Sequence, residues 1–360
     1  FGADVTLQGD LAFPNVTTSN LFTSRLGLYT PDANVFARNP LSLLRPDVCA
    51  VGNVVDGPRG QGDFYGSVLL NDGRVLFVPH SSANVGLFDP SQSLLTIVSP
   101  VGLDNSLSKF VGGVRAPNGT VVFVPYNSSN VGLFDPGSRT YSNGPSVGAP
   151  GLGLYEGGVR TFDGNVVFVP SQSSNLGIFN SVTGVFTNVQ VGASGFSGGV
   201  LTRSGNLVAI PNTSINVGVW NPYPFPGTWT NVTTRAGGFS GGLLAPNGNV
   251  VFVPSTASNV GLFNPVTNEF SNAISCPSGF RGGSVLPTGN IIFTGSNIAM
   301  YAWALNSVTN VAQISDGHVD GVLIPDGRVV LSPWNSTNVC VLQTVASTTL
   351  EYCLGDSFGT

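Results

Sequence analysis

The sequence predicts an all-β fold built from repeated four-stranded sheets, and three observations lead to this prediction. The 360 residues include 48 glycines and 25 prolines spread along the whole chain, and both residue types are unfavourable inside helices. Only 9% of the residues are charged while 41% are hydrophobic, a balance that excludes a disordered chain. The third observation is an internal repeat that occurs seven times.

Each repeat contains an apolar segment, a glycine turn, a second apolar segment that ends in proline, a loop and a third apolar segment. The copy GGVRAPNGTVVFVPYNSSNVGLFDP begins at Gly112, and GGLLAPNGNVVFVPSTASNVGLFNP begins at Gly241. The seven copies begin near residues 66, 112, 157, 198, 241, 282 and 320. Repeats of this kind are typical of four-stranded β-propeller blades, so we expect a propeller of seven clear blades over residues 65–360.

The strands of one repeat can be assigned in order. We expect a first strand at 113–116, closed by the turn 117–119, because its Asn-Gly pair favours the positive φ of a tight hairpin. The second strand, at 120–124, ends at a proline, which removes a ladder donor. A third strand at 130–134 and a weaker fourth near 140–142 complete the sheet. The first two strands are almost continuously apolar, which indicates burial on both faces.

Residues 1–64 fit the repeat less well. The segment TSRLGLYTP at 23–31 is similar to SSNVGLFDP at 128–136. Two interpretations remain open: a degenerate eighth blade, or an N-terminal extension that packs on a seven-bladed ring. The last repeat has its own candidate for a fourth strand, at 348–353, so a strand from the N-terminal segment is not required.

The order of apolar strand, Asp/Asn-Gly turn, apolar strand ending in proline and the phrase VGLFDP resembles the propeller superfamily that contains NHL, YWTD and gluconolactonase-like repeats. The resemblance covers residues 66–354. It implies the fold, but propellers of this group serve as receptor modules, lectins, lyases and hydrolases. The resemblance therefore does not select a function.

Charge and hydropathy exclude several partners. The chain has 13 basic residues, of which Lys109 is the single lysine, and 18 acidic residues. Without a basic patch, nucleic acid is not an expected partner. No apolar run is long enough for a transmembrane segment. The chain starts at Phe1 without a signal peptide, so we expect a mature secreted or surface protein whose partners are copies of itself, other extracellular proteins or glycans.

Glycosylation and disulfides are expected from the same interpretation. Six sequons occur, at Asn15, Asn118, Asn127, Asn212, Asn231 and Asn335. Four of them follow a proline that ends a second strand, namely Asn15, Asn127, Asn212 and Asn335. In a propeller these loops share one face, which glycans would coat. The four cysteines predict the bridges Cys340–Cys353 and Cys49–Cys276, since secreted folds favour bridges, and buried thiols are the alternative.

Candidate catalytic residues are few. The two histidines, His80 and His318, fall in the first and last repeats, which are neighbours in a closed seven-bladed ring. They could form a metal or acid–base site with Asp316 or Asp320, whereas an eighth blade would separate them. Two unrelated surface histidines are the simpler interpretation. We expect no metal, no cofactor and no catalytic constellation.

An asparagine precedes the third strand of every repeat. Its side chain is expected to fix the preceding loop by hydrogen bonds to backbone, and the alternative is a sugar-binding site in each blade. The residues are Asn84, Asn130, Asn175, Asn216, Asn259, Asn297 and Asn338.

These observations favour a non-enzymatic extracellular glycoprotein, a structural or adhesive subunit of a coat or filament. The reasons are the near-identical repeats, the scarcity of titratable groups and the lack of an asymmetric polar cluster. Two alternatives remain: a glycan-binding propeller lectin, and an enzyme of the propeller lyase or lactonase type.

Overall fold

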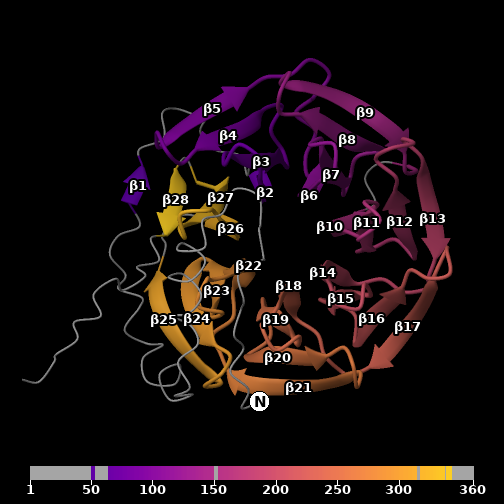
Figure 1. The fold of residues 1–360 in the computed structure, drawn as a ribbon, viewed down its shortest axis with the longest axis vertical. Coiled ribbons are helices and arrows are strands. Elements are labelled where there is room, and N and C mark those ends of the chain that lie inside the picture. The colour runs from indigo at the N-terminus through magenta and orange to yellow at the C-terminus, as the bar shows by residue number, and fades with distance from the viewer. Residues whose placement is uncertain (1–49, 53–63, 150–152, 314–316, 337, 343–360) are drawn as a thin grey trace, which may run out of the picture. The chain divides into compact units, whose positions relative to one another are not determined.

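The computed structural model describes residues 50–52, 64–149, 153–313, 317–336 and 338–342. All of them belong to the second of two compact units, Leu44–Thr360. They form seven four-stranded antiparallel sheets arranged around a central axis, which is a seven-bladed β-propeller (Figure 1). The predicted fold is thus confirmed. No helix in this described part of the chain is long and apolar enough to cross a membrane.

Six blades use four consecutive strands, ordered from the axis outward (Figure 1). The first three are β2 (Phe64–Leu69), β3 (Val75–Pro79), β4 (Val85–Asp89), β5 (Leu94–Val98); β6 (Phe110–Arg115), β7 (Val121–Pro125), β8 (Asn130–Asp135), β9 (Thr140–Ser146); and β10 (Tyr155–Arg160), β11 (Val166–Pro170), β12 (Asn175–Phe179), β13 (Phe186–Gln190). The next three are β14 (Phe196–Leu201), β15 (Leu207–Pro211), β16 (Asn216–Asn221), β17 (Thr228–Thr233); β18 (Phe239–Leu244), β19 (Val250–Pro254), β20 (Asn259–Asn264), β21 (Glu269–Ser275); and β22 (Phe280–Val285), β23 (Ile291–Gly295), β24 (Asn297–Ala302), β25 (Ser307–Gln313).

The seventh blade combines an early strand of the chain with the last three strands. Its inner strands are β26 (Gly317–Leu323), β27 (Val329–Asn335) and β28 (Val339–Leu342), and its fourth strand is β1 (Ala50–Gly52). The strand β1 pairs antiparallel with β28 (Figure 1). The fourth strand that the sequence suggested at 348–353 lies outside the described residues. The outer strand of this blade is thus β1, from the N-terminal part of the sequence. The sequence did not indicate that this blade requires a strand from that part.

The ring closes directly between the seventh and first blades. The Ser67 backbone N–H donates to Oδ2 of Asp320 at 3.2 Å, and the Ser332 hydroxyl donates to the carbonyl of Gly66 at 3.3 Å. These contacts leave no place for an eighth blade between the two. Residues 1–49 and 53–63 lie outside the described part, so the domain assignment of the N-terminal segment stays a prediction.

The second strand of each blade forms the core between neighbouring sheets. In β7 every residue from Val121 to Pro125 is buried, as expected for a strand covered on both faces. Aromatic rings from the first and second strands pack against each other, for example Phe110 and Phe123 with centroids 5.4 Å apart. The core is thus repeated blade by blade rather than gathered into one centre.

The first strand of each blade starts earlier than predicted. The sequence suggested 113–116, whereas β6 starts at Phe110, which pairs with Pro125. The register then shifts between Phe110 and Gly113, which is a β-bulge. A bulge re-aims the side chain that it contains, and the same irregularity occurs in the first strand of all seven blades.

Candidate functional site

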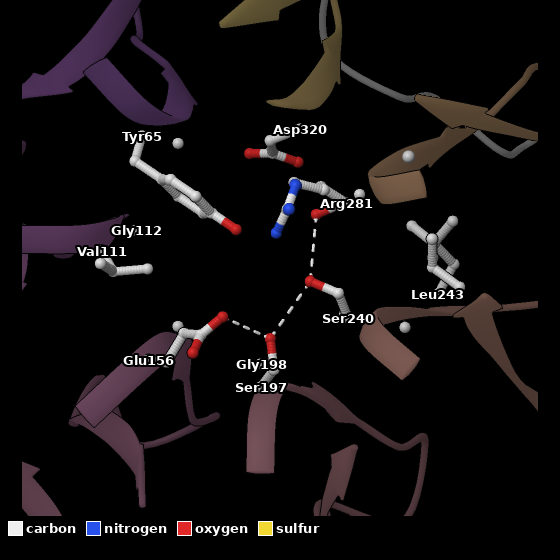
Figure 2. A pocket seen from close by; sticks show the side chains of 17 residues that line it. Tyr65, Val111, Gly112, Glu156, Ser197, Gly198, Ser240, Leu243, Arg281 and Asp320 are labelled. Atoms are coloured by element: carbon white, nitrogen blue, oxygen red, sulfur yellow. Dashed lines mark hydrogen bonds between the residues drawn. The ribbon is translucent and has the colours of Figure 1, made fainter. Parts of the chain in front are cut away.

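The bulges direct one variable side chain per blade toward the axis. In six blades the bulge holds a residue followed by glycine: Tyr65, Val111, Glu156, Ser197, Ser240 and Arg281. In the seventh blade Asp320 takes the position that glycine has elsewhere, with φ 53°. Together they line one cavity of about 220 Å³ at the centre of the ring (Figure 2).

The glycines at these bulges allow the inner strands to approach closely. A Cβ on Gly157 would lie 2.7 Å from the Cα of Gly198, and one on Gly66 would lie 2.9 Å from the Cα of Gly112. Both glycines have positive φ, 75° and 103°, which other residues rarely adopt. The paired glycines therefore permit close backbone packing near the axis.

A chain of hydrogen bonds joins four neighbouring blades on one side of the cavity. The Ser197 hydroxyl donates to Oε1 of Glu156 at 2.5 Å and lies 3.2 Å from the hydroxyl of Ser240. The Ser240 hydroxyl in turn donates to the backbone carbonyl of Arg281 at 3.5 Å. Both serines are buried, so the network is fixed in place, and Figure 2 shows the Glu156 carboxyl facing the cavity.

Burial changes the acidity of the groups in the cavity. It raises the pKa of Glu156, while the hydrogen bond from Ser197 and the charge of Arg281 oppose the rise. Burial, together with the negative charge of Glu156, raises the pKa of the Tyr65 hydroxyl well above its usual range. Tyr65 therefore keeps its proton at neutral pH, and Glu156 exchanges its proton at a higher pH than an exposed glutamate.

The opposite side of the cavity carries a cation beside aromatic rings. The Arg281 guanidinium carbon lies 5.2 Å from the ring centre of Trp334. The Tyr65 ring meets the Trp334 ring edge-on at 6.1 Å and lies 5.7 Å from the ring of His80. Figure 2 shows the Arg281 side chain and the Tyr65 hydroxyl converging on the same space. The cavity is consequently asymmetric, with a carboxyl on one side and a guanidinium on the other.

Asp320 borders this cavity and connects the last blade to the first. Its Oδ2 accepts hydrogen bonds from the backbone N–H and the hydroxyl of Ser67, at 3.2 and 3.4 Å. Burial raises its pKa, and the hydrogen bonds from Gly321 and Ser67 oppose the rise. An aspartate adopts this left-handed conformation more readily than most non-glycine residues.

The two predicted histidines lie in neighbouring blades, as the seven-bladed ring requires. The His80 ring lies tilted beside the Tyr65 ring, and Nε2 of His318 is 3.0 Å from the carbonyl of Asn338. Asp316 lies outside the described residues, and Asp320 accepts its hydrogen bonds from Ser67. A joint site of His80 and His318 stays a prediction. Among the described residues no group of three or more His, Cys, Asp or Glu side chains is arranged to hold a metal ion.

The other predicted positions have varied surroundings. Asn118, Asn231 and Asn335 are exposed, whereas Asn127 and Asn212 are half-buried. Asn15, Cys49 and Cys353 lie outside the described residues, so the use of Asn15 and both disulfides stays untested. Cys276 is buried, which raises the pKa of its thiol to about 11, and Cys340 lies in β28 opposite Val51.

The repeated asparagine shares its predicted loop-fixing role with a serine two residues earlier. In the second blade the Asn130 amide does donate to the carbonyl of Gly144 at 3.0 Å. In addition, the Ser128 hydroxyl donates to the Asn130 carbonyl at 2.8 Å and accepts from the Asn130 N–H at 3.2 Å. The same serine bridge recurs at Ser173, Ser214 and Ser336. The Asn130 amide thus bonds to the fourth strand β9 while the serine holds the loop, and the loop-fixing role of the asparagine side chain stays a prediction.

A second cavity, of about 180 Å³, surrounds Lys109 at the connection between the first two blades. Its Nζ donates to the carbonyls of Ser82 and Ser106, at 2.9 and 3.1 Å. Burial lowers the pKa of this amine to about 8, and Asp104 opposes the change. Both hydrogen bonds hold the connecting loop, which explains the single lysine as a structural residue.

Sequence reasoning missed the central cluster. Its signal was present, because the residue before the glycine is the position that changes chemical type between repeats: Tyr65, Val111, Glu156, Ser197, Ser240 and Arg281. An alignment of the repeats does not show where this residue points. The β-bulge that turns it toward the axis becomes visible only in the folded sheet.

Comparison with known proteins supports the fold and leaves the family open. No protein-family profile and no curated protein matches the sequence. Solved structures do match. A streptogramin B lyase aligns with a TM-score of 0.65 at 15% identity, over 80% of this chain and 95% of that chain. The virginiamycin B lyase from Staphylococcus aureus aligns with a TM-score of 0.67 at 15% identity, over 78% and 95%.

Another match is the extracellular domain of the hybrid two-component system BT3049 from B. thetaiotaomicron. It has a TM-score of 0.61 at 11% identity, over 79% of this chain and 40% of that chain. The chain is a seven-bladed β-propeller. At such identities these likenesses establish the fold alone.

The expectation of a structural or adhesive subunit is wrong. It depended on the lack of an asymmetric polar cluster, and the centre of the ring contains one, with Glu156 and Arg281 on opposite sides. The similar solved structures include streptogramin B and virginiamycin B lyases, so the likeness in fold gives no support to a structural or adhesive role.

Proposed function

We propose that the central cavity is the active site of a lyase-type enzyme that acts on a small polar molecule by acid–base catalysis. The observation that carries this proposal is the convergence of Glu156, Tyr65 and Arg281 on one cavity at the centre of the ring. Titratable groups whose pKa is shifted by burial inside a cavity are characteristic of catalytic sites. The volume, about 220 Å³, is below the roughly 300 to 1,000 Å³ of drug-sized ligand sites, so the substrate is small.

The residues suit an elimination. The Glu156 carboxylate removes a proton from carbon, and the electron pair of that C–H bond forms a C=C bond. The neighbouring C–O bond breaks, and the departing oxygen takes the proton of the Tyr65 hydroxyl. The proton on Glu156 then returns to Tyr65 through solvent, which restores both groups. Arg281 stabilises the negative charge that develops on the substrate.

The serines support this role of Glu156. The hydrogen bond from Ser197 holds the carboxyl in one orientation, and Ser240 extends the support to the next blade. A general base works best when its pKa is near the working pH, and burial moves the pKa of Glu156 in that direction.

The test is a turnover assay with small hydroxy acids, esters and lactones, following the ultraviolet absorbance of the unsaturated product. Glu156→Gln is expected to reduce kcat by roughly 10²- to 10⁴-fold, the usual contribution of general acid–base catalysis. The matched control is Glu269→Gln, because Glu269 is exposed on the outer strand β21. Equal activity of the two variants would overturn the proposal.

We also propose that the protein is secreted and N-glycosylated. The support is the exposure of the sequons at Asn118, Asn231 and Asn335, together with likeness to extracellular domains of two-component systems. Intact mass before and after treatment with an N-glycosidase tests this, and an unchanged mass of the natively expressed protein contradicts it.

A further inference from the structure

The Arg281 guanidinium faces the cavity without an acidic partner among the residues that the structure describes. Ion pairs in this part of the chain join Arg74 to Asp72, Lys109 to Asp104 and Arg328 to Asp326. The two carboxyl groups that share the cavity with Arg281, on Glu156 and Asp320, are not within ion-pair distance of it. The Tyr65 hydroxyl interacts with the Arg281 side chain, and a guanidinium has further N–H donors beyond that contact that can reach a ligand in the cavity.

The ring of Trp334 holds this cation in place. The guanidinium carbon lies 5.2 Å from the ring centre, and the Trp334 ring is itself supported edge-on by Tyr65. A guanidinium that lies against an aromatic ring keeps its edge free, and this planar edge matches the two oxygens of a carboxylate. The aromatic support thus orients Arg281 before any ligand arrives.

The acids of the cavity do not cancel its positive charge. Glu156 accepts its hydrogen bond from Ser197 on the far side of the space, and Asp320 accepts from Ser67. Burial raises the pKa of both carboxyl groups, so each keeps its proton to a higher pH than an exposed carboxyl group does. An anion entering the cavity therefore meets a cation on one side and hydrogen-bonding groups on the other.

We propose that Arg281 binds the carboxylate of a small hydroxy acid, while Glu156, held by its serine network, faces the C–H bond next to that carboxylate. This inference rests on the proposed function, because it names the substrate class of that site. The carboxylate at Arg281 also makes the adjacent C–H bond more acidic, which is the bond that Glu156 must break.

Binding is tested separately from turnover by calorimetric titration of the full chain with lactate and 3-hydroxybutyrate, each compared with its uncharged amide. The acids are expected to bind at least tenfold more tightly than the amides. Arg281→Gln is expected to weaken acid binding at least tenfold, and Arg281→Lys to restore it only in part, because lysine lacks the planar fork. Trp334→Leu is expected to weaken it less.

The matched control is Arg203→Gln, since Arg203 is exposed on a hairpin turn and donates to the carbonyl of Pro246 at 2.6 Å. This variant is expected to bind the acids like the wild type. The melting temperature of each variant is measured as well, to show that it is folded under the conditions of the titration. Failure of both acids to bind the wild type, or equal binding by wild type and Arg281→Gln, overturns the inference.

The two proposals fail in different ways. Binding of the acids that depends on Arg281, without any turnover that depends on Glu156, supports this inference and contradicts the lyase. Turnover that depends on Glu156, together with equal binding of the acids and their amides, supports the lyase and contradicts this inference.

Discussion

The hydroxyl of Ser197 donates a 2.5 Å hydrogen bond to the carboxyl of Glu156, which comes from the neighbouring blade. This bond opposes the effect of burial on Glu156. The balance between the two sets the pH at which the central carboxyl loses its proton.

Ser197→Ala is expected to raise the pKa of Glu156 further, because the variant loses a hydrogen bond that favours the ionised form. The chain contains three glutamates, Glu156, Glu269 and Glu351, so NMR of protein labelled with ¹³C at the glutamate carboxyl resolves the titration. Ser240→Ala is the control, since Ser240 contacts Ser197 rather than the carboxyl. An unchanged titration midpoint in Ser197→Ala would contradict the assigned role of this bond.

Asp320→Asn is expected to raise the melting temperature at neutral pH. The folded-state pKa of Asp320 is raised by burial, so its stabilising contribution is complete below the unfolded-state pKa and is lost as pH rises through the folded-state pKa. Asparagine stays neutral, tolerates positive φ and can still accept from Ser67. The gain should therefore disappear at acid pH.

Asp135→Asn serves as the control, because the pKa of Asp135 is lowered in the folded state whereas that of Asp320 is raised. Hydrogen bonds from Gly137 and Ser138 lower the pKa of Asp135, so its contribution is present above the unfolded-state pKa and is lost as pH falls through the folded-state pKa. Thermal unfolding of both variants between acid and neutral pH checks the pair. Identical pH dependence of the two differences would refute the assignment for Asp320.

Gly157→Ala is expected to destabilise the ring strongly, by at least about 3 kcal/mol. The new Cβ would lie 2.7 Å from the backbone of Gly198 and would also require φ 75°. Gly248→Ala separates these effects, because Gly248 has φ 89° with nothing within 4 Å of the added atom. This control should cost about 1 kcal/mol, as measured by urea unfolding, and equal costs would show that the close approach is unimportant.

Removing residues 1–52 is expected to lower the melting temperature, whereas removing residues 1–43 should have little effect. The longer deletion takes away β1, whose residue Val51 pairs with Cys340 on β28, and leaves a free sheet edge. The shorter deletion ends at the boundary between the two compact units. Calorimetric scans compare the two, and equal melting temperatures would contradict a closing role for β1.

Most of the fold could be predicted from the sequence, because the repeat determines it. Asn118-Gly119 marks a hairpin, and the buried segment Val121–Pro125 marks a central strand. Seven such units are enough to infer a closed ring. The partner of β28 could not be predicted, because pairing between Val51 and Cys340 depends on ring closure and leaves no pattern in a three-residue strand.

The site was harder to predict for a related reason. Glu156 and Arg281 are 125 positions apart, and neither belongs to a catalytic motif. Each reaches the axis because a bulge displaces one residue of the inner strand. His80 and His318 were candidates because the chain contains only two histidines. A change to a polar residue at one fixed position of an apolar repeat is a stronger indicator of a functional site than the rarity of a residue type.

The bulge before each glycine has a wider consequence. In six blades one side chain reaches the axis, and the glycine that follows it keeps the inner strands close together. The residue that determines the chemistry of the cavity is therefore separate from the residue that determines the packing of the ring. Tyr65, Val111 or Ser240 could each be exchanged without redesigning a blade. New binding specificities could therefore be engineered by substituting the one axial residue of each blade.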